Sequence, residues 1–351
     1  MNPKFRNFLV ILIIIFVGLN VSLIYLGFFR PQLSTQIETI KPLSANFETQ
    51  ISPTTVNIQK QKGKMFMVGI PDKVLSNETI KFLTDNNIGG VVLLGNNIED
   101  ETQLKKLTSD LKEKVAKDIL IAIDQEGGTV VRIKWDKYKD LSARDIGNKK
   151  DTNLAYEIAL YRGKLLKELG INVILGPVAD ISNKNSFMYD RSFGSDAKTV
   201  TEMVAASVRG YKDAGIHSVL KHFPGHGKTT TDSHQEFPMI NLGLEQLKKD
   251  DFLPFKAGID AGAEIVMLGH IINTDIDSKP ASLSKKYIEL LEQELGFEGV
   301  VITDDLSMTG KINSSIPWGI NLTLQSRDHV KALIENFVPE GKYYSLVENL
   351  E

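Results

Sequence analysis

The sequence contains no cysteine among its 351 residues. This absence excludes disulfide bonds, a thiolate nucleophile, a zinc site with cysteine ligands and a lipid anchor attached through cysteine. The formal net charge is only -3, so there is no excess of positive charge that would attract nucleic acid. The glycine-rich patterns of phosphate-binding loops and dinucleotide-binding folds are also missing. The candidate chemistry therefore rests on carboxylate, imidazole and amine groups.

Histidine is scarce, and its distribution is uneven. Three of the six histidines lie in the fourteen positions 221–234, which read KHFPGHG at 221–227 and DSH at 232–234. The apolar pair Val219-Leu220 before them predicts the end of a buried strand, after which proline and glycine exclude regular structure. Ionisable groups in a loop directly after a buried strand are typical of the active sites of α/β enzymes. The alternative is a polar surface loop.

Short apolar runs alternate with segments of helical periodicity from residue 63 onward. We expect strands at 64–69, 89–94, 119–123, 173–175, 218–220, 265–268 and 299–303. We expect helices around Ile80 and Leu83 and at 102–117, 154–169, 200–214, 244–261 and 283–295. Continuous apolar runs suit strands buried on both faces of a parallel sheet. Seven of them favour an α/β protein with a TIM-type (β/α)8 barrel over a doubly wound sheet, which usually has about five or six strands.

Ionisable side chains follow four of the expected strands. They are Asp124, the pair Lys221-His222, His270 and the pair Asp304-Asp305. In a (β/α)8 barrel the carboxyl ends of the strands form the rim that carries the active site. A single acid there would be explained as the cap of the next helix, but four such strand ends predict an active site.

Two of these elements suggest glycoside hydrolysis, which needs a nucleophile or base on one face of the sugar and a proton donor on the other. Asp304 is a candidate nucleophile, held rigidly at a strand end. In Asp232-Ser233-His234, the spacing places the carboxylate and the imidazole on the same side of an extended segment. There the carboxylate would orient the imidazole and stabilise its charged form. A metal site built from His222, His226, Asp232 and His234 is the alternative.

These motifs resemble glycoside hydrolase family 3, and within it the bacterial β-N-acetylhexosaminidases. The matching segments, in the family's order, are IDQEGGTVVR at 123–132, RSFG at 191–194, KHFPGHG, DSH and VITDDLSM at 301–308. The resemblance implies a retaining exo-glycosidase that removes terminal β-linked N-acetylglucosamine from peptidoglycan fragments or other glycans, without a metal or organic cofactor. It implies that Asp304 is the nucleophile and that His234, paired with Asp232, is the acid/base. The positions that match sugar-binding residues of the family are Asp124, Arg132, Arg191, Lys221 and His222.

The sequence departs from the family pattern after Met308. The family continues with a helix, an Ala-Gly-x-Asp element and an eighth strand, whereas here only residues 318–324 could serve as a strand. We therefore expect a barrel at 59–310 that is incomplete at strand 8, followed by an atypical tail at 311–351, and we hypothesise a truncation or frameshift near residue 310. A catalytically defective glycan-binding homologue is thus one alternative function, and a metal-dependent hydrolase is another.

The N-terminal part predicts a membrane anchor. Residues 8–29 carry no formal charge and are long enough to cross a bilayer as a helix. Lys4 and Arg6 before them favour a cytoplasmic N-terminus. The run exceeds the usual apolar region of a cleaved signal peptide, and no A-x-A site follows, so we expect an uncleaved signal anchor over 1–29. Residues 30–58 are rich in polar residues and predict a flexible linker. The barrel would then face outside the cytoplasm, with the membrane and a glycan as its partners.

Overall fold

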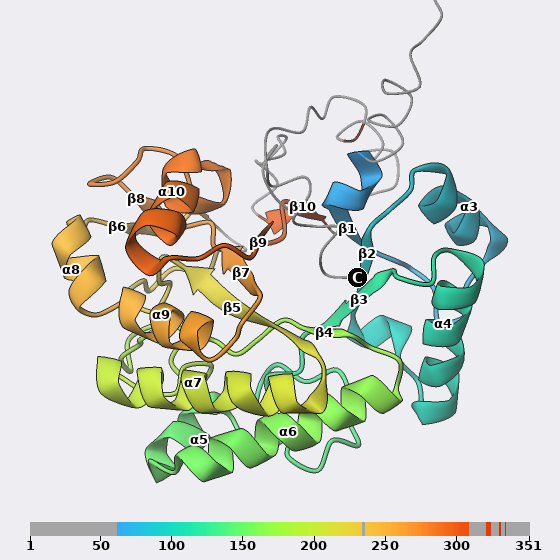
Figure 1. Ribbon diagram of the computed structural model, residues 1–351, viewed down its shortest axis with the longest axis horizontal. Helices are drawn as coiled ribbons and strands as arrows, with labels where there is room; N and C mark the ends of the chain where they lie inside the picture. The colour runs from blue at the N-terminus through green and yellow to red at the C-terminus, as the bar shows by residue number, and fades with distance from the viewer. Residues whose placement is uncertain (1–61, 234–235, 309–320, 324–329, 331–333, 335–351) are drawn as a thin grey trace, which may run out of the picture. The chain divides into compact units, whose positions relative to one another are not determined.

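Eight short parallel strands form the centre of the protein. The computed structural model describes residues 62–233, 236–308 and 321–323 together with Val330 and Ile334 (Figure 1). The strands are β1 (Phe66–Gly69), β2 (Gly90–Leu93), β3 (Leu120–Ile123), β4 (Val173–Ile174), β5 (His217–Phe223), β7 (Ile265–Leu268), β9 (Val300–Thr303) and β10 (Asn321–Thr323). They form one sheet in the order β10-β1-β2-β3-β4-β5-β7-β9. The seven predicted strands are therefore confirmed, with ends that differ by at most three residues.

The eighth strand is present, so the expectation of a barrel incomplete at this position is wrong. β10 runs parallel to β1, with Asn321 opposite Phe66 and Thr323 opposite Val68. On its other side, the Leu322 N–H donates to Thr303 Oγ1 at 3.1 Å, and the Leu322 carbonyl accepts from the Leu306 N–H at 3.0 Å. The sheet therefore curls into a nearly closed TIM-type barrel. β10 lies within the range 311–351 that the sequence suggested as a tail.

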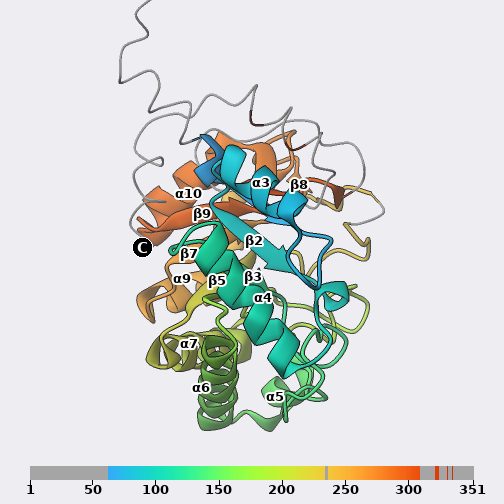
Figure 2. The ribbon, with the colours of Figure 1, turned by 90° about the vertical axis from the view of Figure 1, so that its right-hand side faces the viewer.

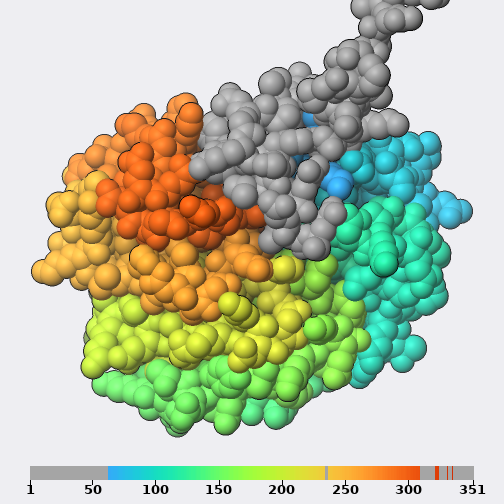
Figure 3. Space-filling view, viewed as in Figure 1, coloured from blue at the N-terminus to red at the C-terminus, as the bar shows by residue number. Residues whose placement is uncertain are grey.

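Helices cover the outside of this barrel (Figures 1 and 2). They are α3 (Asn77–Asp85), α4 (Glu101–Lys114), α5 (Ala143–Lys149), α6 (Thr152–Glu168), α7 (Ala197–Ala214), α8 (Leu244–Lys249), α9 (Phe252–Asp260) and α10 (Lys285–Leu295). Short 3-10 helices and a small parallel pair complete the described elements: η1 (Lys62–Met65), η2 (Gly95–Asn97), η3 (Ala281–Leu283), β6 (Met239–Ile240) and β8 (Ile272–Asn273). In the space-filling view, α6, α7 and α9 form successive bands from green to orange (Figure 3).

The predicted helix at 244–261 is interrupted, and α8 and α9 form in its place. Proline has no N–H to donate to the carbonyl four residues before it, and Pro254 stands four residues after Asp250. Lys249 is the last residue of α8, Asp250 is its C-cap, and Asp251 occupies the N-cap position of α9. This break places the Asp251 side chain between the two helices, close to the loop that follows β5.

The apolar runs are continuous because both faces of the sheet are buried. Alternate side chains point to opposite faces of a strand. In β1, Met67 joins an inner cluster with Val92, Met267 and Leu322, while Phe66 and Val68 pack outward with helix residues. The inner cluster fills the barrel below the carboxyl ends of the strands, so it forms the floor of whatever site lies there.

The described part of the chain contains no helix that is both long and apolar enough to cross a membrane. The predicted anchor at 1–29 and the predicted linker at 30–58 lie outside the described residues.

Replacing Gly210 by alanine should destabilise the protein by about 1–2 kcal/mol, because α6 and α7 pack closely at this point. A Cβ atom on Gly210 would lie 2.5 Å from the Tyr156 carbonyl oxygen and 2.8 Å from the Ala159 Cβ. Overpacking of this kind costs about 1–3 kcal/mol, which exceeds the gain of about 1 kcal/mol in helix propensity. Urea unfolding would measure the change. Gly243→Ala is the control, because nothing lies within 4 Å of a Cβ there; a more stable Gly210→Ala variant would contradict this packing.

Candidate active site

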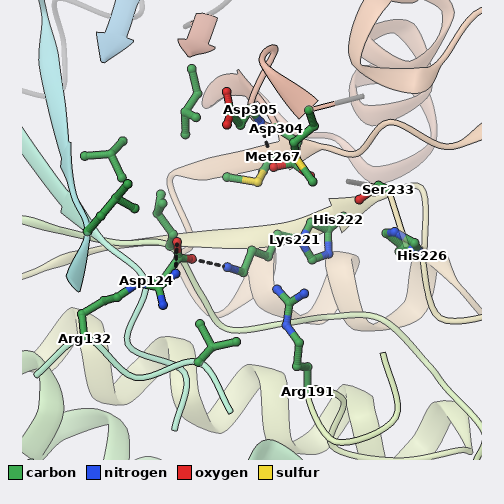
Figure 4. A pocket seen from close by; sticks show the side chains of 16 residues that line it. Asp124, Arg132, Arg191, Lys221, His222, His226, Ser233, Met267, Asp304 and Asp305 are labelled. Carbon is green, nitrogen blue, oxygen red and sulfur yellow. Dashed lines mark hydrogen bonds and ion pairs between the residues drawn. The ribbon is translucent and has the colours of Figure 1, made fainter. Parts of the chain in front are cut away.

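A cavity of about 180 Å³ lies at the carboxyl ends of the barrel strands. Six of the predicted site residues line it together, namely Asp124, Arg132, Arg191, Lys221, His222 and Asp304 (Figure 4). They come from sequence positions up to 180 apart, and the barrel brings them to one place because parallel strands end at the same rim. The structure therefore brings three of the four predicted strand ends to one cavity, whereas His270, at the end of β7, does not line it.

The sheet itself holds the side chains of this rim. Asp124 follows β3 directly, and Lys221 and His222 belong to β5. The Asp304 N–H donates to the Leu268 carbonyl at 2.8 Å, which continues the pairing of β9 with β7 by one residue. Groups placed on paired strands keep their positions better than groups on free loops.

A buried lysine and a partly exposed arginine share one buried carboxylate in this cavity. Lys221 Nζ lies 2.6 Å from Asp124 Oδ1 and 2.7 Å from Glu126 Oε1. Arg191 binds Glu126 with two parallel bonds of 2.9 Å and 2.8 Å. Burial alone would raise the pKa of Glu126, but the charges of Arg191 and Lys221 outweigh it and hold this pKa well below its usual value. Lys221 and Arg191 therefore have fixed positions and stay charged, ready to donate to a ligand.

Glu126 was not assigned a role from the sequence, although it stands within the IDQEGG motif. A signal for it exists, because it lies two residues after Asp124, and alternate residues of an extended segment point to the same side. The backbone holds it in a tight turn, in which the Glu126 N–H donates to the Val130 carbonyl at 3.0 Å. Arg162 also donates to the Glu126 carbonyl at 3.1 Å.

Asp180 is a second buried carboxylate that sequence reasoning missed. It accepts from His222 Nδ1 at 2.8 Å and from the backbone N–H of His226 at 2.6 Å. Burial alone would raise the pKa of Asp180, but His222 outweighs it and the pKa is lowered. The sequence prediction of this strand stopped before Pro177, whereas a parallel bridge between Val178 and Lys221 extends the pairing. The apolar residues Val178 and Ala179, directly before Asp180, were the sequence pattern that could have predicted this continuation.

Asp304 carries the charge that a nucleophile requires. Burial alone would raise the pKa of its carboxyl, but the neighbouring His222 outweighs this effect, helped by His270, and the pKa lies below the usual range. The backbone N–H of Asp305 also donates to Asp304 Oδ1 at 2.8 Å. This bond holds one oxygen, so the carboxylate is oriented as well as ionised.

The neighbouring Asp305 has a different role. Its carboxylate accepts from the Ser307 N–H at 2.8 Å and from the Ser307 hydroxyl at 2.6 Å. Its backbone carbonyl accepts from His270 Nε2 at 2.8 Å. Asp305 thus shapes the turn after β9, and His270 supports the turn from the end of β7.

The predicted acid/base pair is described in part. Asp232 is partly exposed, and Ser233 is buried and lines the same cavity as Asp304. His234 lies outside the described residues. The pairing of Asp232 with His234 therefore stays a prediction, and the position of Ser233 is consistent with it.

Two buried polar atoms of this cavity have no hydrogen-bond partner among the described residues. They are Arg132 Nε and His226 Nε2, on opposite sides of the close-up view (Figure 4). The Thr229 hydroxyl donates to the His226 carbonyl at 2.9 Å, so it accepts from His226 Nδ1 at 2.7 Å. This leaves His226 Nε2 as an acceptor, while burial lowers the pKa of His226 and keeps the ring neutral. One donor and one acceptor suit a ligand with hydroxyl groups, which do both.

Within the described ranges, no three histidine, aspartate or glutamate side chains could together hold a metal ion. Of the four candidate ligands considered from the sequence, His222 and His226 use their Nδ1 atoms to bind Asp180 and Thr229. His234 lies outside the described residues.

A parallel (β/α)8 barrel with an ionised aspartate, further carboxylates and fixed cations at its carboxyl rim is typical of barrel enzymes that bind polar, hydroxyl-rich ligands. The chain matches the glycosyl hydrolase family 3 N terminal domain over residues 57–335. It belongs to this family and is a glycoside hydrolase. The resemblance found in the sequence motifs is thus confirmed.

Curated relatives and solved structures agree with this family. A β-hexosaminidase of Xylella fastidiosa (strain M23) is 34% identical over 251 residues, which cover 70% of this chain and 75% of that protein. A β-hexosaminidase of Tolumonas auensis is 33% identical over 248 residues, which cover 70% and 74%.

Two solved structures share the fold. A family 3 β-N-acetylglucosaminidase from Paenibacillus sp. str. FPU-7 superposes with a TM-score of 0.74 at 31% identity, over 79% of this chain and 57% of that one. This chain therefore spans little more than half of the Paenibacillus protein. NagZ from Neisseria gonorrhoeae, in complex with N-trifluoroacetyl-D-glucosamine, has a TM-score of 0.73 at 28% identity, over 82% and 89%.

Proposed function

We propose that this glycoside hydrolase is a retaining exo-enzyme that removes terminal β-linked N-acetylglucosamine from peptidoglycan fragments or other glycans. The observation that carries the proposal is the ionised carboxylate of Asp304 at a cavity that holds all five predicted sugar-binding residues. The names of the relatives, β-hexosaminidase and β-N-acetylglucosaminidase, support this substrate class.

In the proposed reaction, Asp304 attacks the anomeric carbon while the imidazolium of His234 protonates the leaving glycosidic oxygen. The C–O bond to the aglycone breaks, and an ester forms between the sugar and Asp304. The neutral imidazole then takes a proton from water, which attacks the same carbon and releases Asp304 and the sugar with retained configuration. Asp232 would orient the imidazole and stabilise its charged form. Ser233, which lines the cavity directly before His234, supports this placement.

The charged residues would bind the sugar hydroxyls. Lys221 and Arg191 donate, and Asp124 accepts. Because Lys221 Nζ already bonds to two carboxylate oxygens, its third proton is free for one ligand bond. The site would thus recognise the positions of the sugar hydroxyls with side chains that are already oriented before the sugar binds.

We also propose, from the sequence alone, that residues 8–29 anchor the protein in the cell membrane as a single-pass helix, with the barrel outside the cytoplasm. That placement would give the enzyme access to cell-wall glycans. Protease accessibility of the barrel in intact cells would test it.

The catalytic proposal is tested by turnover of a chromogenic β-N-acetylglucosaminide, with β-glucoside and β-xyloside as comparisons. We expect hydrolysis of the first at a higher kcat/KM than the other two, with retention of anomeric configuration by NMR. A folded protein that binds N-acetylglucosamine without turnover would instead indicate a glycan-binding homologue. Activity that a chelator abolishes would indicate a metal-dependent hydrolase.

A further inference from the structure

The loop at 224–233 connects β5 to the predicted acid/base pair, and its first half is attached to the segment that follows β4. The His226 N–H donates to Asp180 Oδ1 at 2.6 Å. Gly227 packs against the Ile181 backbone so closely that a Cβ atom would lie 2.1 Å from the Ile181 carbonyl oxygen. This side of the loop therefore has a defined position against the barrel.

The opposite side of the loop is attached by an ion pair. The Lys228 ammonium binds the carboxylate of Asp251, at the start of α9. The Lys228 side chain is 31% exposed, whereas that of Asp251 is 2% exposed. Gly225 also lies against this carboxylate, because a Cβ atom there would be 3.2 Å from Asp251 Oδ1. Neither Lys228 nor Asp251 lines the cavity.

Burial makes the Asp251 carboxylate depend on Lys228. A carboxylate removed from water is costly unless a charge or donor compensates it. Burial raises the pKa of Asp251, and the charge of Lys228 opposes that rise. Lys228 is thus held over Asp251, and it stands four positions before Asp232. The break between α8 and α9 is what brings Asp251 to this position.

We propose that the Lys228–Asp251 ion pair is a positioning device for the loop that carries Asp232 and His234, and that it controls proton transfer without touching the sugar. The inference rests on the proposed function for the roles of these two residues. Proton transfer is sensitive to placement, since a shift of about 1 Å can cost on the order of 10²-fold in rate.

A leaving-group series separates this role from a purely structural one. An aglycone of high pKa needs protonation as the glycosidic bond breaks, whereas a dinitrophenolate departs without it. In Lys228→Met we expect kcat/KM to fall about 10- to 100-fold for β-N-acetylglucosaminides of unactivated phenols, but less than about threefold for the dinitrophenyl substrate. Lys228→Arg keeps the cation and should recover most of the loss.

The control is Lys248→Met, which removes a lysine of similar exposure, 34%, from its ion pair with Glu294. It should leave the whole series unchanged. If Lys228→Met fails to fold, the double variant Lys228→Met/Asp251→Asn removes both charges and leaves no buried unpaired carboxylate. If the wild-type enzyme is active and Lys228→Met loses kcat/KM equally for all leaving groups, or does not lose it at all, the positioning role is wrong. The proposed function is then unaffected. A wild-type enzyme inactive on every substrate would defeat both.

Discussion

Replacing Asp304 by alanine should lower kcat/KM by about 10⁴-fold or more, because the variant has no group to form the glycosyl-enzyme ester. The carboxylate is ionised and oriented by the Asp305 N–H, and it stands on a paired strand end that the substitution does not disturb. Folding should therefore remain intact. Steady-state kinetics on the chromogenic substrate and a thermal unfolding curve would measure both effects.

Asp305→Asn is the matched control for this prediction, since it changes the adjacent carboxylate at the same strand end. The asparagine oxygen can still accept from the Ser307 N–H that Asp305 binds. We expect a loss smaller than about tenfold in this variant. Near-normal turnover in Asp304→Ala would remove the nucleophile role from Asp304 and with it the proposed mechanism.

Replacing Glu126 by glutamine should lower the free energy of unfolding by about 3 kcal/mol, because it leaves the buried Lys221 and the partly exposed Arg191 without their shared anion. Arg191 would lose a bidentate partner, and Lys221 would keep Asp124 alone. Since both cations also face the cavity, kcat/KM should fall as well. Urea unfolding at pH 7 would measure the stability change. Glu101→Gln is the control, because Glu101 forms an exposed pair with Lys105, which contributes less than about 1 kcal/mol.

The same substitution should change the response of the protein to acid. The pKa of Glu126 in the folded state lies below its ordinary value, so its stabilisation is fully present above about pH 4.3 and is lost as pH falls further. The wild-type protein should therefore lose more stability between pH 7 and about pH 3 than Glu126→Gln loses. An identical pH dependence in both proteins would show that Glu126 does not carry this charge.

The candidate site combines residues that the sequence predicted with others that it did not. Asp124, Lys221, His222 and Asp304 were identified because each follows an apolar run, and the barrel then places such strand ends at one rim. Asp180 was missed because its strand resumes after a proline. Its partnership with His222 spans 42 positions, and no local pattern reports a contact of that range.

The eighth strand illustrates the same limit. Residues 318–324 were the only candidate for this strand in the sequence, and β10 lies within them, but Asn321-Leu322-Thr323 has a single apolar residue between two polar ones and so gave no strong strand pattern. It forms a strand because the edge of β1 that is not paired with β2 supplies backbone partners, and because Thr303 supplies a hydroxyl that accepts a hydrogen bond. The break between α8 and α9 depends on the local sequence instead. Pro254 has no N–H to donate to the Asp250 carbonyl, so the sequence alone could have predicted this interruption.

The sequence by itself determined the alternation of strands and helices, the polar strand ends and the family motifs, because these depend on periodicity and on neighbours along the chain. Only the tertiary structure decided that Glu126 joins Arg191 to Lys221, that Asp180 holds His222, that Lys228 meets Asp251, and that β10 fills the eighth position. These pairings form between distant parts of the chain, where burial makes a charge or a backbone group costly unless a partner is placed beside it.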